Sequence, residues 1–198
     1  MSKTSKRNQK LVILDLDDLL VKRHRGKTVD EITQLMDTLN LDGPKNQLMA
    51  LPRFTLELRS NLPSFFRELF KRCRVAIWTS ATRENATNVV KSILTKEQRG
   101  QLLFSWSRDE CALDPSYDPA LTDSEIKFYS TIKPFTRIVE SQAINEKRTW
   151  NQDNVLIIDN SELKLRFNPE STKLVWPDFA CNIMDVFNHP FFRSAEEA

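Results

Sequence analysis

The chain has 198 residues, of which 40% are hydrophobic and 28% charged, and its 29 basic and 27 acidic side chains nearly cancel. This size and composition are typical of one globular domain and exclude an intrinsically disordered chain. The balanced charge argues against direct nucleic-acid binding, and no apolar run approaches the roughly 20 residues of a membrane-spanning helix.

We expect a single domain over residues 10–193, flanked by flexible tails at 1–9 and 194–198. The start of the chain is polar and basic, with no apolar stretch before Leu11, so we expect no secretory signal. Three short apolar runs predict strands that are buried on both faces, as in a parallel sheet: Leu11–Leu14, Val75–Trp78 and Val155–Ile158.

The segments between these runs predict helices, because their apolar residues recur at helical spacing. The predicted helices are Val29–Leu39, Pro63–Cys73, Arg83–Leu94 and Phe135–Ala143. One further segment, Arg53–Ser60, alternates apolar and polar residues and predicts a half-exposed strand. The polar, proline-containing stretch 107–134 predicts a loop or small insertion.

Strands that alternate with helices predict an α/β fold, here a Rossmann-like parallel sheet flanked by helices, with small insertions and no large cap domain. With only three glycines, the chain has neither a Walker-type phosphate loop nor a dinucleotide-binding turn. The three cysteines are far apart and form no C-x-x-C pair, which predicts reduced thiols and an intracellular protein, nuclear or cytoplasmic.

Polar side chains follow each predicted strand: Asp15 and Asp17 after the first, Thr79 and Ser80 after the second, and Asp159 and Asn160 after the third. Because ligands bind outside the carboxyl ends of parallel strands, we expect these side chains to lie close together. Two carboxylates at the end of a buried strand need neutralisation, which a divalent cation provides. An all-oxygen ligand set from Asp15, Asp17 and Asp159 suits Mg²⁺.

Further groups at this edge favour a phosphate ligand. Lys133 adds positive charge, Thr79 adds a hydroxyl group, and the helix that begins near Arg83 points its N-terminal dipole toward the same edge. A carboxylate in such a site can act as a nucleophile through an aspartyl-phosphate. The sequence therefore predicts phosphoryl transfer.

The order and spacing of these residues resemble the haloacid dehalogenase superfamily, whose first motif, D-x-D-x-[T/V], matches residues 15–19. More narrowly, the chain resembles the carboxy-terminal-domain protein phosphatases of the Fcp/Scp type. Those phosphatases read D-L-D-E-T-L where this chain reads D-L-D-D-L-L, and the similarity extends over residues 11–180.

The resemblance implies a role for each matching residue. Asp15 would be the nucleophile and a Mg²⁺ ligand, and Asp17 the general acid/base, binding Mg²⁺ through its backbone carbonyl. Thr79, Ser80 and Lys133 would hold the phosphoryl group. Asp159 would complete the metal site, with Asn160 in support.

Two positions depart from the family pattern. Leu19 stands where the family has Thr or Val, so a hydroxyl group is missing and the larger side chain has room to crowd the turn beneath the metal site, which bears on the catalytic rate. Glu162 replaces a proline and adds negative charge near the site, which bears on substrate preference. The basic stretch Lys22–Lys27 is either a clamp for acidic or phosphorylated partners or, by default, a solvated loop.

The first hypothesis is a Mg²⁺-dependent phosphatase that hydrolyses phosphoserine or phosphothreonine in a protein segment. RNA polymerase II tail repeats are the substrate that the family resemblance implies. The alternative is a catalytically weak or inactive phosphatase-like binding module of the same fold. A phosphatase of small molecules or nucleic-acid ends is disfavoured by the missing cap and the near-neutral charge. We expect a monomer whose partner is a phosphorylated protein.

Overall fold

The computed structural model describes residues 10–38, 47–116, 131–147, 149–176, 179 and 181–193. Both predicted tails and the middle of the predicted insertion, residues 117–130, lie outside the described residues. None of the helices in the described ranges has the length and apolar character needed to cross a membrane.

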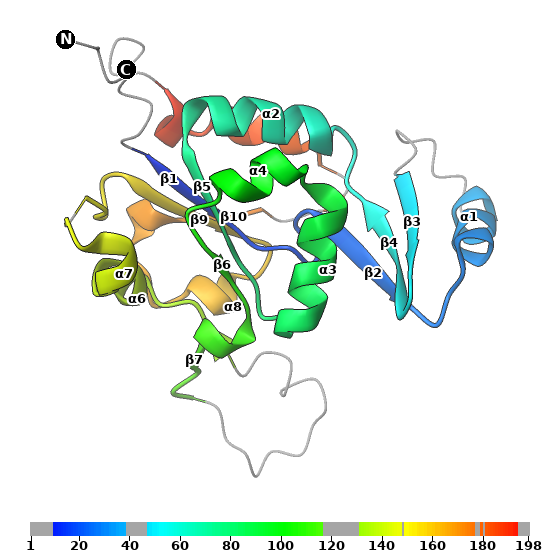
Figure 1. Cartoon of the computed structure of the whole chain (residues 1–198), viewed down its shortest axis with the longest axis horizontal. Helices are drawn as coiled ribbons and strands as arrows, with labels where there is room; N and C mark the ends of the chain where they lie inside the picture. The colour runs from blue at the N-terminus through cyan, green and yellow to red at the C-terminus, as the bar shows by residue number, and fades with distance from the viewer. Residues whose placement is uncertain are drawn as a thin grey trace.

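A five-stranded parallel sheet forms the centre of the fold, in the order β10-β9-β1-β5-β6 (Figure 1). Its strands are β1 (Leu11–Leu14), β5 (Arg74–Trp78), β6 (Ser105–Trp106), β9 (Val155–Asp159) and β10 (Lys173–Val175). The three strands predicted from the sequence are therefore confirmed, and they lie side by side in the middle of the sheet. In this register Leu14 pairs with both Ile77 and Ile158, so the three strands end at one edge.

Alternate side chains of these strands enter two separate hydrophobic clusters, one on each face of the sheet. One face is covered by α2 (Leu62–Arg72), α3 (Arg83–Ile93), α4 (Lys96–Gln101) and the 3₁₀ helices η4 (Ile183–Asn188) and η5 (Pro190–Phe192). The other face is covered by α6 (Thr136–Val139), α7 (Gln142–Asn145) and α8 (Glu162–Leu165). The expected α/β fold is thus confirmed as three layers.

The predicted helix Phe135–Ala143 is wrong in its extent, because the chain forms two short helices, α6 and α7, with a break at Ser141. Ser141 has extended backbone angles, φ −70° and ψ 108°. The Asn145 side chain compensates for the interrupted helix, donating from Nδ2 to the carbonyl oxygens of Val139 (3.1 Å) and Trp150 (2.9 Å). A buried amide that caps two segments thus outweighs the helical pattern.

A second, antiparallel sheet has the order β2-β4-β3, with β2 (Val21–Arg25), β3 (Gln47–Leu51) and β4 (Phe54–Leu58). Helix α1 (Val29–Thr38) lies beside β3 (Figure 1). The sheet and this helix form the small insertion between Asp15 and Thr79. In the part of the chain that the structure describes, no large cap covers the strand ends.

Two expectations about this small sheet are wrong. The strand β4 is buried throughout rather than half-exposed, because it is the central strand and its polar side chains have partners. Thr55 Oγ1 donates to the carbonyl oxygen of Lys27 at 2.8 Å, and Glu57 contacts His24 Nε2 at 2.8 Å. The basic stretch Lys22–Lys27, whose default interpretation was a loop, is largely the strand β2.

The remaining elements are short. The predicted insertion 107–134 contains the 3₁₀ helix η2 (Arg108–Glu110) and a two-stranded antiparallel pair, β7 (Ala112–Leu113) and β8 (Thr131–Ile132). A further 3₁₀ helix, η3 (Glu170–Thr172), precedes β10. All three cysteines are free, as expected.

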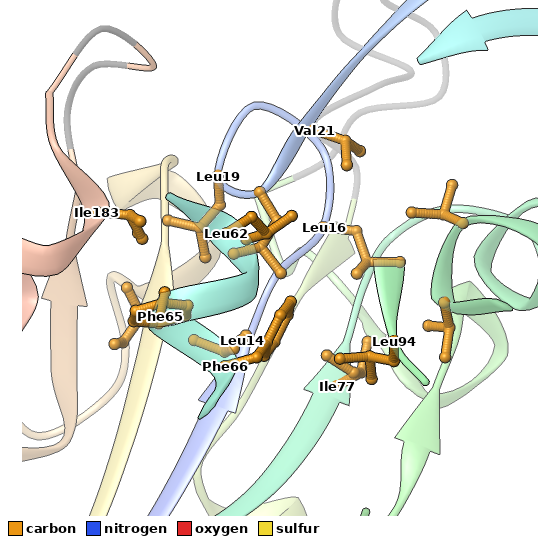
Figure 2. Packing of buried hydrophobic residues seen from close by; sticks show 14 of the residues in the cluster. Leu14, Leu16, Leu19, Val21, Leu62, Phe65, Phe66, Ile77, Leu94 and Ile183 are labelled. Atoms are coloured by element: carbon orange, nitrogen blue, oxygen red, sulfur yellow. The ribbon is translucent and has the colours of Figure 1, made fainter. Parts of the chain in front are cut away.

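The Leu19 side chain lies in the larger hydrophobic cluster, fully buried with Leu62 and Ile183 (Figure 2). Its carbonyl oxygen accepts a hydrogen bond of 2.6 Å from Arg59 Nε. The core therefore accommodates the leucine side chain at this departure from the family pattern.

Replacing Leu19 with Ala is expected to lower the free energy of unfolding by about 2–5 kcal/mol, because the truncation leaves a cavity in a packed core. Urea denaturation followed by circular dichroism measures this loss. The Leu19→Met variant, which conserves volume, is the matched control and should lose less than about 1.5 kcal/mol. An Ala variant as stable as the unmodified chain would show that Leu19 is not a core residue.

Candidate active site

The ends of β1, β5 and β9 bring Asp15, Thr79 and Asp159 to one edge of the central sheet. Asp15 N donates to the carbonyl oxygen of Ile158 at 2.9 Å, and Thr79 N donates to that of Trp106 at 3.1 Å. These bonds extend the sheet pairing beyond β1 and β5, so the backbone of both site residues is held by neighbouring strands. The predicted convergence of the strand ends is present.

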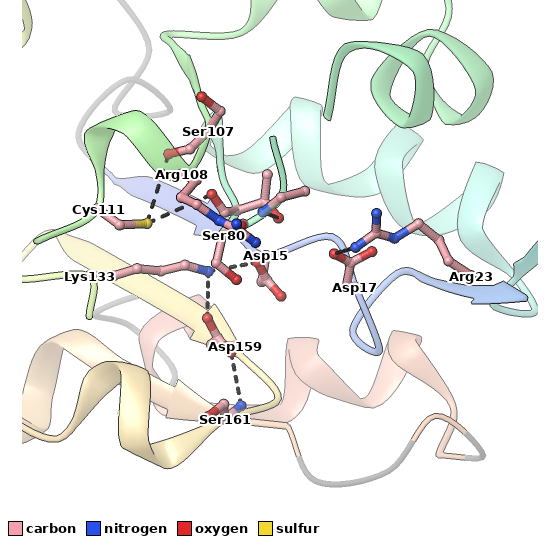
Figure 3. A network of polar contacts seen from close by, with 12 residues as sticks. Asp15, Asp17, Arg23, Ser80, Ser107, Arg108, Cys111, Lys133, Asp159 and Ser161 are labelled. Carbon is pink, nitrogen blue, oxygen red and sulfur yellow. Dashed lines mark hydrogen bonds and ion pairs between the residues drawn. The ribbon is translucent and has the colours of Figure 1, made fainter. Parts of the chain in front are cut away.

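Lys133 lies between two of the predicted carboxylates (Figure 3). Its Nζ donates to Asp15 Oδ1 at 2.7 Å and to Asp159 Oδ2 at 2.5 Å, and all three side chains are at most 1% exposed. The main chain of Lys133 is also held: its N donates to the carbonyl oxygen of Lys164 at 2.9 Å, and its carbonyl oxygen accepts from Asn168 Nδ2 at 2.9 Å. Lys133 is thus fixed on both sides of the site.

The charges of this group stabilise one another. Burial raises the pKa of Asp15, but the positive charges of Lys133 and Lys164 and the hydrogen bonds to the carboxylate together outweigh burial, so the pKa lies below its usual value. Burial alone would lower the pKa of Lys133, yet Asp15 and Asp159 raise it above its usual value. At neutral pH Asp15 is therefore an ionised carboxylate, the form that can attack phosphorus.

The Asp17 side chain points away from Lys133 and Asp159 and contacts the guanidinium group of Arg23 (Figure 3). Burial raises the pKa of Asp17, Arg23 opposes this, and the negative charge of Asp15 adds to the increase, so that the net pKa is raised. A carboxyl group with a raised pKa holds its proton at higher pH, which suits a group that donates protons. No sequence pattern identifies Arg23 as a partner of Asp17.

Thr79 and Ser80 begin the loop that leads from β5 to α3. Thr79 is fully buried, and its Oγ1 accepts a hydrogen bond of 3.2 Å from Ala81 N. The carbonyl oxygen of Ser80 accepts from Arg108 Nε at 2.7 Å. Because α3 begins three residues after Ser80, its free backbone N–H groups lie next to this loop, as the sequence predicted.

A magnesium site is compatible with the oxygens at this edge. Within the described ranges, no three His, Cys, Asp or Glu side chains lie together as a metal-binding group. However, Asp15 Oδ2, Asp17 Oδ1 and Asn160 Oδ1 are buried oxygens without a hydrogen-bond partner. Such oxygens are costly unless a ligand contacts them, and oxygen is the ligand atom that Mg²⁺ prefers. The donor set therefore fits Mg²⁺.

The oxygens without hydrogen-bond partners favour other metal-binding roles for Asp159 and Asn160 than those that the family resemblance implies. Both carboxylate oxygens of Asp159 already have partners: Oδ2 accepts from Lys133, and Oδ1 accepts from Ser161 N at 2.9 Å. Asn160, which the resemblance gave a supporting role, has the unpartnered side-chain oxygen. Asn160 is therefore at least as well placed as Asp159 to supply a metal ligand.

A cavity of about 460 Å³ lies at this end of the molecule. Of the predicted site residues, Asp17, Ser80 and Asn160 line it. Its other lining residues are Asp18, Arg23, Arg25, Ala81, Thr82, Asn85, Arg108, Ser161 and Lys164. A phosphoryl group that reaches the buried Asp15 would pass these side chains.

The sequence pointed to two of the four basic residues of this cavity. Arg23 and Arg25 belong to the basic stretch Lys22–Lys27, a possible clamp for acidic partners, whereas no sequence pattern assigned a role to Arg108. No sequence pattern indicated Lys164 as a site residue either, because it lies between apolar residues in a short helix. Spatial proximity alone identifies it.

Residues 10–186 match the profile of the family described as NLI interacting factor-like phosphatase. The chain belongs to this family. The match covers every predicted site residue of this NLI interacting factor-like domain, and it confirms the resemblance to the Fcp/Scp-type phosphatases drawn from the motifs.

Similar proteins agree with the family assignment at low identity. An uncharacterized FCP1 homology domain-containing protein of Schizosaccharomyces pombe is 22% identical over 162 residues, which are 82% of this chain and 58% of the relative. Two structures of Fcp1, described as an RNA polymerase II CTD phosphatase, match with a TM-score of 0.54 and 17% identity. One of them is a fission yeast variant bound to beryllium fluoride.

These relatives are longer than this chain. The match covers 86% of this chain but only 42% of the Fcp1 chains. At this identity the likeness establishes the fold, a parallel sheet flanked by helices. This NLI interacting factor-like domain thus corresponds to a part of each larger protein.

Proposed function

We propose that this domain is a Mg²⁺-dependent phosphatase that hydrolyses phosphoserine or phosphothreonine in protein segments. One observation carries the proposal. In a chain of the NLI interacting factor-like phosphatase family, Lys133 holds one oxygen of a buried, ionised Asp15 and leaves the other oxygen, Oδ2, without a partner. An ionised carboxylate oxygen that is oriented by a fixed cation is suited to nucleophilic attack.

In the first step, Asp15 Oδ2 attacks phosphorus, a new O–P bond forms, and the bond from phosphorus to the serine or threonine oxygen breaks. Asp17 donates its proton to the departing oxygen, for which its raised pKa is suitable. In the second step, water attacks the aspartyl-phosphate while Asp17 accepts a proton from it. Phosphate then leaves, and Asp15 is regenerated as a carboxylate.

The other residues orient and neutralise the reacting groups. Lys133 keeps Asp15 ionised and oriented, and the hydroxyl groups of Thr79 and Ser80 would donate to phosphoryl oxygens. Asp15 would hold Mg²⁺ through the oxygen that does not attack phosphorus, together with the backbone carbonyl oxygen of Asp17 and the Asp159–Asn160 pair. When bound, Mg²⁺ would neutralise charge on the phosphoryl group. Most of the catalytic effect in phosphoryl transfer comes from such positioning and neutralisation.

The substrate is proposed to be an extended protein segment. Among the described residues nothing caps the cavity above Asp17 and Ser80, so a phosphorylated side chain can enter while its backbone stays outside. Repeats of the RNA polymerase II tail are one candidate, because Fcp1 is described as a phosphatase of that domain. We further propose that the protein is a monomer and acts in the nucleus or cytoplasm.

Removal of divalent cations is expected to abolish hydrolysis of p-nitrophenyl phosphate and of phosphoserine peptides, because the negative charges at Asp15 and the phosphoryl group are then not neutralised. Phosphate release is measured in EDTA and after Mg²⁺ is restored. Mg²⁺ should recover the activity, while Ca²⁺, which takes more ligands at longer distances, should not. Full activity in EDTA would contradict the metal dependence.

The alternative, a binding module without activity, gains some support from the ion pair between Asp17 and Arg23, which holds the general acid at one side. It predicts phosphopeptide binding with no phosphate release under any metal condition. Isothermal titration alongside the phosphate assay therefore separates the two functions.

Replacing Arg23 with Met is expected to shift the alkaline limb of kcat/KM to higher pH. Arg23 lowers the pKa of Asp17, so its removal raises that pKa, and Asp17 then keeps the proton that it donates to higher pH. The matched variant Arg23→Lys retains the positive charge and should leave the limb close to its original position. If the alkaline limb of kcat/KM lies at the same pH in Arg23→Met as in the unmodified chain, Asp17 does not titrate as the general acid.

A further inference from the structure

Basic side chains dominate the cavity beside the proposed catalytic residues. Arg23 and Arg25 come from β2, Arg108 from η2 and Lys164 from α8, whereas the carboxylates among the lining residues are those of Asp17 and Asp18. Three separate elements thus direct positive charge into one cavity. A concave site with charges of one sign concentrates the field and attracts ligands of the opposite sign.

Most of these basic side chains form no ion pair within the described residues. Arg23 pairs with Asp17, but Arg25, Arg108 and Lys164 have no carboxylate partner among the described residues. Some arginines outside the cavity do have such partners. Arg53, for example, pairs with Glu84 at 3.1 Å.

Arg108 is held in a conformation that suits anion binding. Its backbone N donates to the carbonyl oxygen of Ala81 at 2.9 Å, and its side-chain Nε donates to that of Ser80 at 2.7 Å. Figure 3 shows its guanidinium group beside Ser80, which it contacts through Nε. The two terminal nitrogens have no partner in the described part of the chain. A guanidinium group fixed through Nε presents these nitrogens as a fork for carboxylate or phosphate oxygens.

We propose that Arg25 and Arg108 form a second anion subsite, which selects protein segments that carry another acidic group near the phosphorylated residue. This inference rests on the proposed function and deepens it. The phosphoryl group that is cleaved uses Ser80, Thr79 and Lys133, while the second group binds the terminal nitrogens of Arg108 and the guanidinium group of Arg25. Because Arg108 contacts Ser80 directly, the second group belongs within about two or three residues of the first, at about 3.3 Å per residue of extended chain.

The second group can be a phosphate or a carboxylate, since both offer oxygens to arginine. A phosphate carries more charge and should be preferred. The selection therefore favours segments with two neighbouring phosphorylated residues, or with a glutamate next to the phosphorylated residue, over segments that carry a single phosphate among neutral residues.

A set of three phosphoserine peptides tests the subsite with the full chain and Mg²⁺. The peptides are identical except for one position, two residues from the phosphoserine, which is glutamine, glutamate or a second phosphoserine. We expect kcat/KM to rise by about tenfold from glutamine to the second phosphoserine, with glutamate between them. The preference should fall to about twofold or less in Arg108→Gln and decrease in Arg25→Gln. Repeating the set with the variable position on the other side of the phosphoserine covers both directions of the peptide.

The Arg53→Gln variant is the matched control, because it removes one arginine outside the cavity and should retain the full preference. Equal kcat/KM for all peptides in both directions, or an equal loss of preference in Arg53→Gln and Arg108→Gln, would overturn the subsite. Fluorescence anisotropy with the same peptides separates this failure from failure of the proposed function. If no peptide is hydrolysed, tighter binding of the doubly phosphorylated peptide that is lost in Arg108→Gln still supports the subsite, and equal binding refutes it.

Discussion

Asp15→Asn is expected to reduce phosphate release by about 10⁴-fold or more, to the background rate. The substitution replaces the attacking carboxylate by an amide of nearly the same shape, so the nucleophile is lost while the packing is retained. It also leaves Lys133 with Asp159 as a partner, which limits the structural effect. The rate of phosphate release from a phosphoserine peptide in Mg²⁺ measures this loss.

Asp18→Asn is the matched control for this variant. Asp18 is exposed and adopts a left-handed backbone conformation, φ 58°, which asparagine tolerates well. This variant should therefore keep both its fold and its activity. If Asp15→Asn kept a substantial part of the activity, Asp15 would not be the nucleophile.

Lys133→Met is expected to lower the free energy of unfolding by about 3–5 kcal/mol near neutral pH, as well as to abolish activity. Lys133 contacts two carboxylates that are at most 1% exposed. Its removal leaves both negative charges buried without the ammonium group that neutralises them. Urea denaturation of both forms over a range of pH measures this loss.

The pH dependence of this loss has a defined sign. The raised pKa of Lys133 stabilises the fold below the usual value of 10.5, and the lowered pKa of Asp15 stabilises it above the usual value of 3.8. The loss in Lys133→Met should therefore be largest between these values and decrease as the pH falls through the acidic range. Lys71→Met, in which an exposed lysine 3.5 Å from Glu68 is removed, is the control and should cost less than about 1 kcal/mol. A loss for Lys133→Met as small as this would contradict the buried ion-pair network.

The central sheet could be predicted from the sequence because its strands are short apolar runs buried on both faces. Such runs, separated by helical patterns, leave few arrangements other than a parallel sheet. Once Leu14, Ile77 and Ile158 share a register, the side chains that follow them must meet. The convergence of Asp15, Thr79 and Asp159 was therefore predictable in position.

Features that depend on tertiary contacts could not be predicted. The alternation of apolar and polar residues in Arg53–Ser60 indicates a half-exposed strand. However, β4 is the central strand of its sheet, and its buried Glu57 side chain contacts His24, which lies 33 residues earlier in the chain. The break between α6 and α7 depends on a side-chain amide, that of Asn145. Local patterns carry no information about such partners.

The same distinction applies within the candidate site. Its residue types follow a motif, but the partner of each side chain is set in three dimensions. The pairing of Asp17 with Arg23, and the occupation of both Asp159 oxygens by Lys133 and Ser161, became apparent only from the structure. The unpartnered oxygen of Asn160 is a further example.

The proposed aspartyl-phosphate can be trapped directly. The domain is mixed with a phosphoserine peptide and Mg²⁺, quenched within the first turnover and reduced with borohydride, which converts an aspartyl-phosphate to homoserine. Tandem mass spectrometry then locates the modified residue. We expect homoserine at position 15, formed only when both substrate and Mg²⁺ are present. Phosphate release with Asp15 unmodified under these conditions would contradict the proposed mechanism.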